Sequence, residues 1–393
     1  MNEIMKLVHL DAPVRQERGV LHTPAEILQQ PAVWRATSQV VGQHWHELSQ
    51  WSKAAGAGPI LLTGAGSSHY VGVALAPLLT SALGVPVMAV PSTEILFDPE
   101  GSLPRNMAGL ISFARSGESP EGNAAFGLVK RHRPSAKHLV ITCNAAGELA
   151  RLAGQTSGAV TLLLPPETND RSLAMTSSFT SMIVAAQALA FAGDFAPYAH
   201  HVERLASAAE RTLHMYCDRI AAVAGRGLRQ IMFLGSGVHL GTAMESRLKV
   251  SELTAGKVST LHEGILGLRH GPMAALGAET AIVYYLSADP YRRRYELDLM
   301  REIEAKGLGG YRLAVAPRRD TDLAGLVDEV VEVDPDGGLD LADDFLPPAF
   351  VTVGQLLGLF LSLGCGLAPD APSRGVIHRT VQGVTIYPFE AQG

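Results

Sequence analysis

The segment PILLTGAGSSHYVGVALAPLL (59–79) decides the fold. It joins a short apolar run, 59–63, through a glycine-containing turn to a stretch with helical periodicity. A short run of consecutive apolar residues is typical of a strand that is buried on both faces of a parallel sheet. The glycines allow the chain to turn tightly from the strand into the helix. The segment therefore predicts one strand–turn–helix unit of an α/β fold.

The same pattern occurs twice along the chain. Apolar runs follow at 108–117, 137–144 and 159–166, and a second set with closely similar intervals lies at 229–237, 280–290, 311–318 and 329–335. Segments with helical periodicity lie between the runs. Strands that alternate with helices predict a doubly wound parallel sheet, and the repeated spacing predicts a duplicated domain. Ligands of such sheets bind at the carboxyl ends of the strands.

The composition indicates a protein that acts on a small molecule. The chain has 393 residues, of which 47% are hydrophobic and 18% charged, enough for two ordinary domains. Its net charge of -6 gives no basic field, so we expect neither nucleic acid nor a membrane surface as a partner. Three separated cysteines without a CxxC pair indicate a reducing compartment, so we expect a cytoplasmic location. No run approaches the roughly 18 apolar residues of a membrane span, and no signal peptide is evident.

The N-terminal residues predict a helical arm. Thr23-Pro24-Ala25-Glu26 has the spacing of a capping box, and Pro31 is expected to begin a second helix. We therefore expect a helical extension over 1–50, a first domain over 51–215, and a second domain with a C-terminal tail over 216–393.

The turn GAGSSH (64–69) is a candidate anion site. Unpaired N–H groups at a helix N-terminus, together with the hydroxyls of Ser67 and Ser68 and the small Gly66, suit a phosphate group. A dinucleotide site is the first alternative, but His69 stands where that fingerprint has its third glycine, and the P-loop lysine is missing too. A turn that only caps the helix is the second alternative.

The next strand ends in SFARSGESP (112–120), which again leads into a helix. Ser119 is the expected N-cap and Pro120 the first helical residue. With Ser116, it would add hydroxyl donors to the same phosphate, and Arg115 is either a further charge or a solvated loop residue. The loop 167–171, after a later strand, is either part of the site or structural.

A line of charged residues marks the second half. Glu245, Lys249 and Glu252 have i, i+4, i+7 spacing and share one helix face. One interpretation is a surface ladder of salt bridges, worth a few tenths of a kcal/mol per pair. The other is a reaction centre, because the helix follows the strand and glycine turn at 229–237, so its first turns lie at the ligand edge of the sheet.

His270 lies in GLRHGP (267–272), where glycine and proline flank it and fix its loop. A histidine held in this way can serve as a positioned acid or base, although a lone histidine is more often structural. Metal binding by His262, Glu263 and His270 is the competing use. Their spacing matches no metal-ligand motif, so no metal is expected.

Taken together, these motifs resemble the AgaS family, double sugar-isomerase (SIS) domain proteins described as tagatose-6-phosphate ketose/aldose isomerases or galactosamine-6-phosphate deaminases. The resemblance covers nearly the whole chain and rests on LTGAGSS (62–68), SFARSGESPE (112–121), ITCNAAG (141–147), PPETNDRSLAMTSS (165–178), LGSG (234–237), LKVSELTAGK (248–257), GLRHGP (267–272) and PDAPSRGVIHRTVQGVTIYP (369–388). It implies two tandem, flavodoxin-like SIS domains and no cofactor.

The isomerase half of glucosamine-6-phosphate synthase is a more distant relative whose site residues can be carried over by position. The resemblance implies phosphate binding by Ser67 and Ser68, with Arg115, Ser116 and Ser119 near its second binding loop. It implies proton transfer between C1 and C2 by Glu252, with Lys249 and Glu245 beside it. It also implies ring opening by His270, which in the relatives comes from the partner subunit, and hence a homodimer with a shared active site.

Two departures from that relative bear on the reaction. Arg379, beside His378, stands near the place of an active-site lysine, so we expect no imine with that lysine and count Arg379 as a substrate-binding candidate. No glutaminase domain precedes the repeat, so release of ammonia is expected. The resemblance thus implies conversion of galactosamine-6-phosphate to tagatose-6-phosphate and ammonia. The alternatives are a plain aldose/ketose isomerase of a 6-phosphosugar, a glucosamine-6-phosphate deaminase and a non-catalytic sugar-phosphate sensor.

Overall fold

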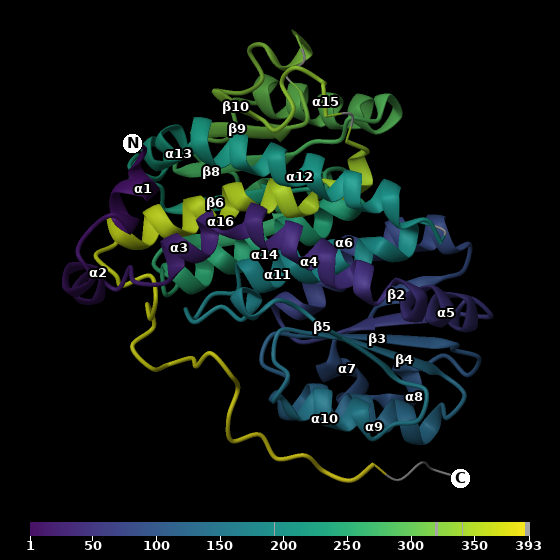
Figure 1. The fold of residues 1–393 in the computed structure, drawn as a ribbon. Helices are drawn as coiled ribbons and strands as arrows, with labels where there is room; N and C mark the ends of the chain where they lie inside the picture. The colour runs from purple at the N-terminus through teal and green to yellow at the C-terminus, as the bar shows by residue number, and fades with distance from the viewer. Residues whose placement is uncertain (192, 319–320, 340, 390–393) are drawn as a thin grey trace. The chain divides into compact units, whose positions relative to one another are not determined.

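The computed structural model describes residues 1–191, 193–318, 321–339 and 341–389, and the chain divides into two compact units. The first-sheet unit comprises Val33–Asp170, Ser177–Val202 and the chain from Ile377 onward. The second-sheet unit comprises Met1–Ala32, Arg171–Thr176 and Glu203–Val376. Each unit contains one five-stranded sheet. Figure 1 shows the fold, with most of the strands labelled.

The sheet of the first-sheet unit has the strand order β2-β1-β3-β4-β5, and every pair is parallel. Its strands are β1 Ile60–Thr63, β2 Val87–Ala89, β3 Gly109–Ala114, β4 Lys137–Thr142 and β5 Val160–Leu163. Because all of them run in one direction, the turns that follow β1 and β3 leave the same edge of the sheet. That edge is where the sequence predicted the phosphate site.

Helices cover both faces of this sheet. Helix α6 (Ser67–Leu83) lies on one face, where Gly72 allows it to approach Leu62 and Ala89 closely. The other face packs Leu61, Leu110 and Val140 against side chains of α7 (Ser92–Phe97), α9 (Pro120–His132) and α10 (Glu148–Gly154). In Figure 1 these three helices lie together below the sheet. Burial on both faces explains why the inner strands are continuous apolar runs.

The second-sheet unit repeats this topology with the strand order β10-β9-β8-β6-β7, again all parallel. Its strands are β6 Gln230–Leu234, β7 Ser259–Glu263, β8 Thr280–Tyr285, β9 Tyr311–Ala316 and β10 Glu329–Glu332. One face packs against α14 (Val238–Leu253) and α16 (Pro347–Gly364), and the other against α15 (Pro290–Ala305). The predicted duplication of a doubly wound parallel domain is therefore confirmed.

The predicted N-terminal arm is also helical. The helices that precede β1 are α1 Glu3–Val8, α2 Ala12–Arg18, α3 Thr23–Leu28, α4 Gln30–Gln43 and α5 Trp45–Ala55. The helices between β1 and β6 that have not yet been named are α8 Pro99–Ser102, α11 Ser177–Gln187, α12 Phe195–Met215 and α13 Cys217–Ala224. Ile4, Leu7 and Ile27 of the arm belong to the same buried cluster as residues of α13 and α16. The first helices therefore contribute to the core of the second-sheet unit.

Two strands, β2 and β7, were not predicted from the sequence. Both lie at an edge of their sheet, and neither is a continuous apolar run. In β2 only Val87 is fully buried, and β7 has the sequence STLHE with four half-buried residues. An edge strand packs one flank only, so its composition does not carry the signal of a buried strand.

The capping box predicted at Thr23 is wrong. Thr23 is the first helical residue of α3 and His22 the N-cap, without a side-chain cap. The carboxylate of Asp370 caps this helix instead: it accepts hydrogen bonds from the backbone N–H groups of His22 and Thr23 and from the Thr23 hydroxyl, the last two at 2.8 and 2.7 Å. The Thr23 N–H, from which the Glu26 carboxylate of a capping box would accept, donates to Asp370, and Glu26 accepts from the backbone N–H of Arg171. A distant carboxylate has replaced the local cap.

Helix α16 departs from the expectation that no run approaches a membrane span. Pro347–Gly364 is long and apolar enough by length and hydropathy, but 83% of this window is buried inside the structure. It packs against α13, α14 and the core of the second-sheet unit. The apolar surface of α16 is therefore buried in the protein core.

We expect Asp370→Ala to lower the free energy of unfolding by about 1–2 kcal/mol, because two backbone donors and a hydroxyl lose their acceptor at the start of α3. Asp11→Ala is the matched control, since Asp11 is the N-cap of α2 but makes no side-chain cap bond. Urea denaturation of both variants checks this. An equal effect of the two substitutions would contradict the capping role.

Candidate functional site

The turn after β1 has the geometry of an anion cradle. Gly66 adopts φ 56° and ψ −126°, a conformation that side-chain-bearing residues rarely accept. Gly64 has no room for a Cβ, because that atom would meet Ser68. The hydroxyl-bearing residues Ser67 and Ser68 form the first turn of α6 and are 4% and 5% exposed. The glycines thus let a helix begin directly at the end of a strand, with two serines at its positive end.

The loop after β3 supplies the second set of predicted residues. Ser116 accepts a hydrogen bond from the Glu118 backbone N–H at 3.2 Å. Ser119 is the N-cap of α9, as predicted, and accepts from the Gly122 backbone N–H at 3.3 Å. Arg115 is only 6% exposed, so it is not the solvated loop residue of the alternative interpretation.

Two polar residues that the sequence analysis did not select support these loops. Asn144, just after β4, donates from its side-chain amide to the Ser116 carbonyl at 2.8 Å. Asp170 is 1% exposed and accepts from the backbone N–H groups of Ser177 and Ser178 at the start of α11. The loop 167–171 is therefore at least structural. An acidic residue shortly before a serine-rich helix start was the available signal.

Arg379 connects the C-terminal segment to two of these loops. Its Nε donates to the Asp170 carbonyl at 2.6 Å, and its Nη2 donates to the side chain of Asn169. Its own carbonyl accepts a hydrogen bond from the Arg115 guanidinium. Arg379 therefore contacts both the loop after β3 and the loop after β5. These contacts occupy the Nε and Nη2 groups of its guanidinium.

Two buried hydroxyls lie on β1 and β3, at the last residue of β1 and two residues before the end of β3. Thr63 and Ser112 are paired in the sheet register, and each is 3% exposed. Within the described ranges, neither hydroxyl oxygen has a hydrogen-bond partner. Buried polar groups usually have one, so their presence at the ligand edge favours a polar occupant there. The sequence analysis did not select these two residues.

The line of charges on α14 is not a surface ladder. The side chains of Lys249 and Glu245 are completely buried, and that of Glu252 is 21% exposed. The ammonium Nζ of Lys249 lies 2.6 Å from Glu252 Oε2 and 3.3 Å from Glu245 Oε1. One buried lysine therefore holds two carboxylates, of which only Glu252 is accessible to a ligand.

Helix α16 explains this burial. A Cβ at Gly358 would meet Leu253 and the carbonyl of Lys249, and a Cβ at Gly354 would meet Ser246. The two helices therefore approach so closely that glycine is needed at the crossing. The close crossing removes Lys249 from water. A buried ammonium group is tolerated only when it is paired with carboxylates and hydrogen-bonded.

The three residues weighed as metal ligands do not form a cluster. The described residues contain no group of three or more His, Cys, Asp or Glu side chains that could hold a metal ion. Glu263 accepts from the Gly264 backbone N–H at 2.8 Å. Burial, with the charge of Arg247, lowers the pKa of His262. His270 ends the short 3-10 helix Gly267–His270 and is exposed.

The second sheet has an equivalent turn with different chemistry. Gly237 adopts φ 59° and ψ −128°, nearly the values of Gly66, and Gly235 is as crowded as Gly64. The residues that follow Gly237 are Val238 and His239, so the two serine hydroxyls of the first turn are absent at this one. The backbone of the cradle is retained, but its hydroxyl donors are not.

Carboxylates of the chain itself occupy this second edge. Asp343 accepts from the Ser287 hydroxyl at 2.6 Å and from the Ala288 backbone N–H at 2.8 Å, and it lies 3.6 Å from His239 Nε2. Although burial raises the pKa of Asp343, these partners hold it well below its usual range. Glu296 accepts from the Ser287 backbone N–H. The donors that follow β8 are thus already bound to internal anions.

Comparison with known proteins identifies the class. Residues 55–192 match the SIS domain. Together with two doubly wound sheets whose strand-end turns have the same backbone conformation, this match defines a SIS-domain protein.

Longer similarities identify the family. The chain is 42% identical to AgaS of Streptomyces coelicolor, over 94% of this chain and 96% of that one. It is 37% identical to D-galactosamine-6-phosphate deaminase AgaS of Escherichia coli, covering 84% and 86%. The structure of tagatose-6-phosphate ketose/aldose isomerase from Escherichia coli superimposes with a TM-score of 0.84 at 33% identity, over 94% of this chain and 97% of that one. The chain therefore belongs to the AgaS family.

The buried carboxyl group of Glu296 predicts a pH-dependent stability. Burial raises its pKa from 4.5 to about 7, against the effects of Arg293 and the Ser287 N–H. Because the pKa is higher in the folded chain, this group's contribution to stability is full below pH 4.5 and is lost as the pH rises through about 7. The difference corresponds to about 3 kcal/mol. Glu296→Gln should remove this slope, whereas Glu304→Gln, exposed on the same helix, should keep it. Urea denaturation between pH 4.5 and 7.5 measures both, and parallel curves for wild type and Glu296→Gln would contradict the prediction.

Proposed function

We propose that this protein converts galactosamine-6-phosphate and water to tagatose-6-phosphate and ammonia. The observation that carries the proposal is the Glu245–Lys249–Glu252 line, in which the Glu252 side chain is 21% exposed although those of Lys249 and Glu245 are completely buried. The AgaS relatives, one of them named for this deaminase activity, support the choice of substrate.

The phosphate group is assigned to the first-sheet cradle. Ser67 and Ser68 at the start of α6, with Ser116 after β3, offer hydroxyl and backbone donors to a dianion. The Ser119 hydroxyl donates to Glu121 Oε2 at 2.9 Å and joins these donors when it turns from Glu121 to the phosphate. Gly66 allows the close approach, and Arg115 adds a buried positive charge. The unpartnered hydroxyls of Thr63 and Ser112 support a polar occupant at this edge.

Glu252 is assigned the proton transfer. Once the ring is open, its carboxylate takes the C2 proton of the aldose and delivers it to C1. This leaves a ketose-type skeleton with an iminium at C2, and addition of water there expels ammonia and forms the C2 carbonyl. Lys249 fixes the position of Glu252 through its 2.6 Å contact and offers positive charge to the enol-like intermediate. Glu245 balances the charge of Lys249 from the buried side.

His270 is assigned ring opening in the site of a partner subunit of a homodimer. Its side chain is exposed in the single chain, and Gly271, at φ 131°, and Pro272 restrict the loop that carries it. A fixed, exposed histidine suits a group that acts on a substrate outside its own chain.

A plain aldose/ketose isomerase is the second candidate. It is favoured by the similarity to a structure named tagatose-6-phosphate ketose/aldose isomerase, and it uses the same C1–C2 proton transfer. The two activities differ only in whether an amine leaves C2. Arg379, tied to Asn169 and Asp170, supports a reaction without an imine from a lysine at this position.

Glu252→Gln should lower kcat for ammonia release by about 10²–10⁴-fold, because the amide cannot accept the C2 proton. Substrate binding should change little, since Gln keeps the shape of Glu. Glu100→Gln, an exposed surface change, is the control and should keep the wild-type rate. Ammonia release from galactosamine-6-phosphate and calorimetric binding measure the two effects. A variant at position 252 with near wild-type turnover would rule out this role.

The same assay separates the alternative substrates. We expect ammonia from galactosamine-6-phosphate faster than from glucosamine-6-phosphate, and slower interconversion of galactose-6-phosphate and tagatose-6-phosphate. Faster turnover of the unaminated pair would establish the plain isomerase instead. Binding of all these sugars without turnover would establish a sensor.

Co-expression of Glu252→Gln and His270→Ala chains tests the shared site. Each homodimer should be inactive, but a mixed dimer has one site with both groups intact. Random assortment should therefore restore about one quarter of the wild-type activity. A mixture as inactive as its components would show that both groups act within one chain.

A further inference from the structure

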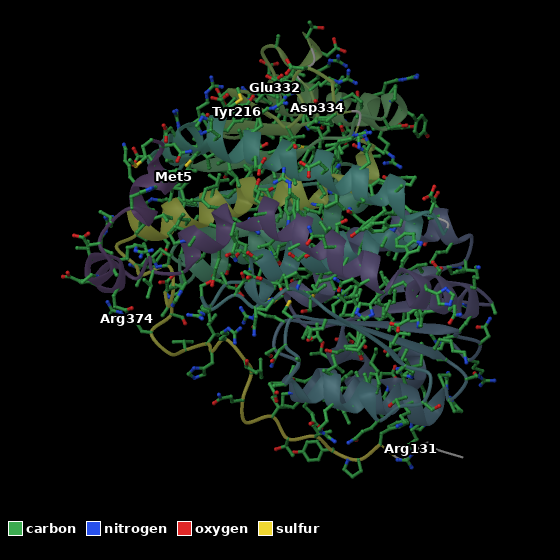
Figure 2. All side chains as sticks on the ribbon, in the orientation of Figure 1. Met5, Arg131, Tyr216, Glu332, Asp334 and Arg374 are labelled. Atoms are coloured by element: carbon green, nitrogen blue, oxygen red, sulfur yellow. The ribbon has the colours of Figure 1, made fainter. Side chains whose placement is uncertain are left out.

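A polar cavity lies at the opposite edge of the first sheet from the serine loops. Its volume is about 250 Å³, and its lining residues are Lys130, Pro134, Ala136, Lys137, His138, Thr156, Ser157 and Gly158. These residues come from the C-terminal end of α9, the start of β4 and the turn before β5. In Figure 2, the labelled Arg131 marks that end of α9. The six residues of β4 span about 20 Å, so the cavity is distinct from the cradle at the other end.

His138 is the residue that a structural role does not account for. It is 5% exposed, and its ring packs against Phe126 with centroids 4.5 Å apart. Its Nδ1 is buried and has no hydrogen-bond partner in the part of the chain that the structure describes. A buried, unpartnered ring nitrogen is costly, and a ligand in the adjoining cavity would satisfy the imidazole.

Two lysines at the cavity carry charge that no carboxylate balances. Lys130 donates to the Thr156 hydroxyl at 3.1 Å, a neutral acceptor. Among the described residues, neither Lys130 nor Lys137 makes a salt bridge with an acidic side chain.

We propose that this cavity binds a phosphate dianion, either inorganic phosphate or the phosphate of a monoester, between Lys130, Lys137 and His138. The two ammonium groups supply charge, and the Ser157 hydroxyl supplies a further donor. The Thr156 hydroxyl donates to the Leu152 carbonyl at 2.8 Å and holds Lys130 at the cavity. The neutral imidazole of His138 donates one hydrogen bond from the floor of the cavity. The site is independent of the proposed reaction and uses none of its residues.

Helix-end stabilisation alone does not explain these residues. Basic side chains near the C-terminus of a helix are favourable there, and this accounts for Lys130 and Arg131 on α9. It does not account for Lys137 and His138, which belong to β4. Nor does it account for a buried nitrogen without a partner.

Calorimetric titration with inorganic phosphate tests the proposal in three forms of the full chain. The variant Ser67→Ala/Ser68→Ala weakens the cradle and should retain the cavity site. In this background, Lys130→Gln/Lys137→Gln should weaken the remaining binding by about tenfold or more, whereas Lys53→Gln, an exposed lysine in the same unit, should leave it unchanged. Without the cradle change, Lys130→Gln/Lys137→Gln should keep wild-type turnover. Phosphate binding that is absent in the serine variant, or unchanged by the lysine substitutions, would overturn the proposal.

The ring resonances of His138, assigned with His138→Gln, provide a second measurement that needs no change in stability. Burial and the charge of Lys130 lower the pKa of His138 to about 4. A bound dianion stabilises the imidazolium, so phosphate should shift these resonances and raise this pKa. Resonances that do not move at saturating phosphate would contradict the assignment. Titration with glycerol phosphate separates the sources: shifts with both probes indicate monoester binding, and shifts with inorganic phosphate alone indicate a site for the free ion.

Discussion

The arrangement of the second-sheet unit depends on one fully buried lysine. An ammonium group without water contact is tolerated only when carboxylates and hydrogen bonds replace its hydration, and removal of one partner from such a group costs about 3–5 kcal/mol. Lys249 meets this requirement with Glu245 behind it and Glu252 in front. The close crossing of α16 over α14, with glycine at 354 and 358, keeps water away from the lysine. The same constraint that makes the core stable therefore fixes the position of a partly exposed carboxylate.

The two halves of the duplicated fold share a backbone conformation at the end of their first strand but differ in the side chains that follow it. Gly66 and Gly237 adopt the same unusual conformation, so both sheets present a helix N-terminus at the end of their first strand. In the first sheet, two serines follow Gly66. The hydroxyls of Thr63 and Ser112 have no hydrogen-bond partner among the residues that the structure describes. In the second sheet Asp343 takes up the donors after β8. A carboxylate of the chain thus binds the donors after β8, whereas the first cradle has the serine hydroxyls to which we assign the phosphate.

Much of this could be predicted from the sequence because it depends on local patterns. Apolar runs such as 230–234 mark strands that are buried on both faces, and the i, i+4, i+7 spacing placed Glu245, Lys249 and Glu252 on one helix face. The burial of Lys249 could not be predicted, because α16 lies about a hundred residues further along the chain. Asp370, which caps α3 from a distance of 347 positions in the sequence, was missed for the same reason. The edge strand β7 was missed because its residues are half-buried and form no continuous apolar run. Contacts between distant segments leave no periodic signal.

The C-terminal segment has a consequence for binding at the first cradle. The Arg115 guanidinium, next to Ser116, donates to the carbonyl of Arg379, and the Arg379 side chain in turn holds the loop at Asn169 and Asp170. Asp170 caps α11 through Ser177 and Ser178. An anion that attracts Arg115 therefore acts on a connected set of hydrogen bonds that includes the C-terminal segment. Because such networks are satisfied or broken together, the order of this segment and the affinity for a phosphate group are expected to be linked.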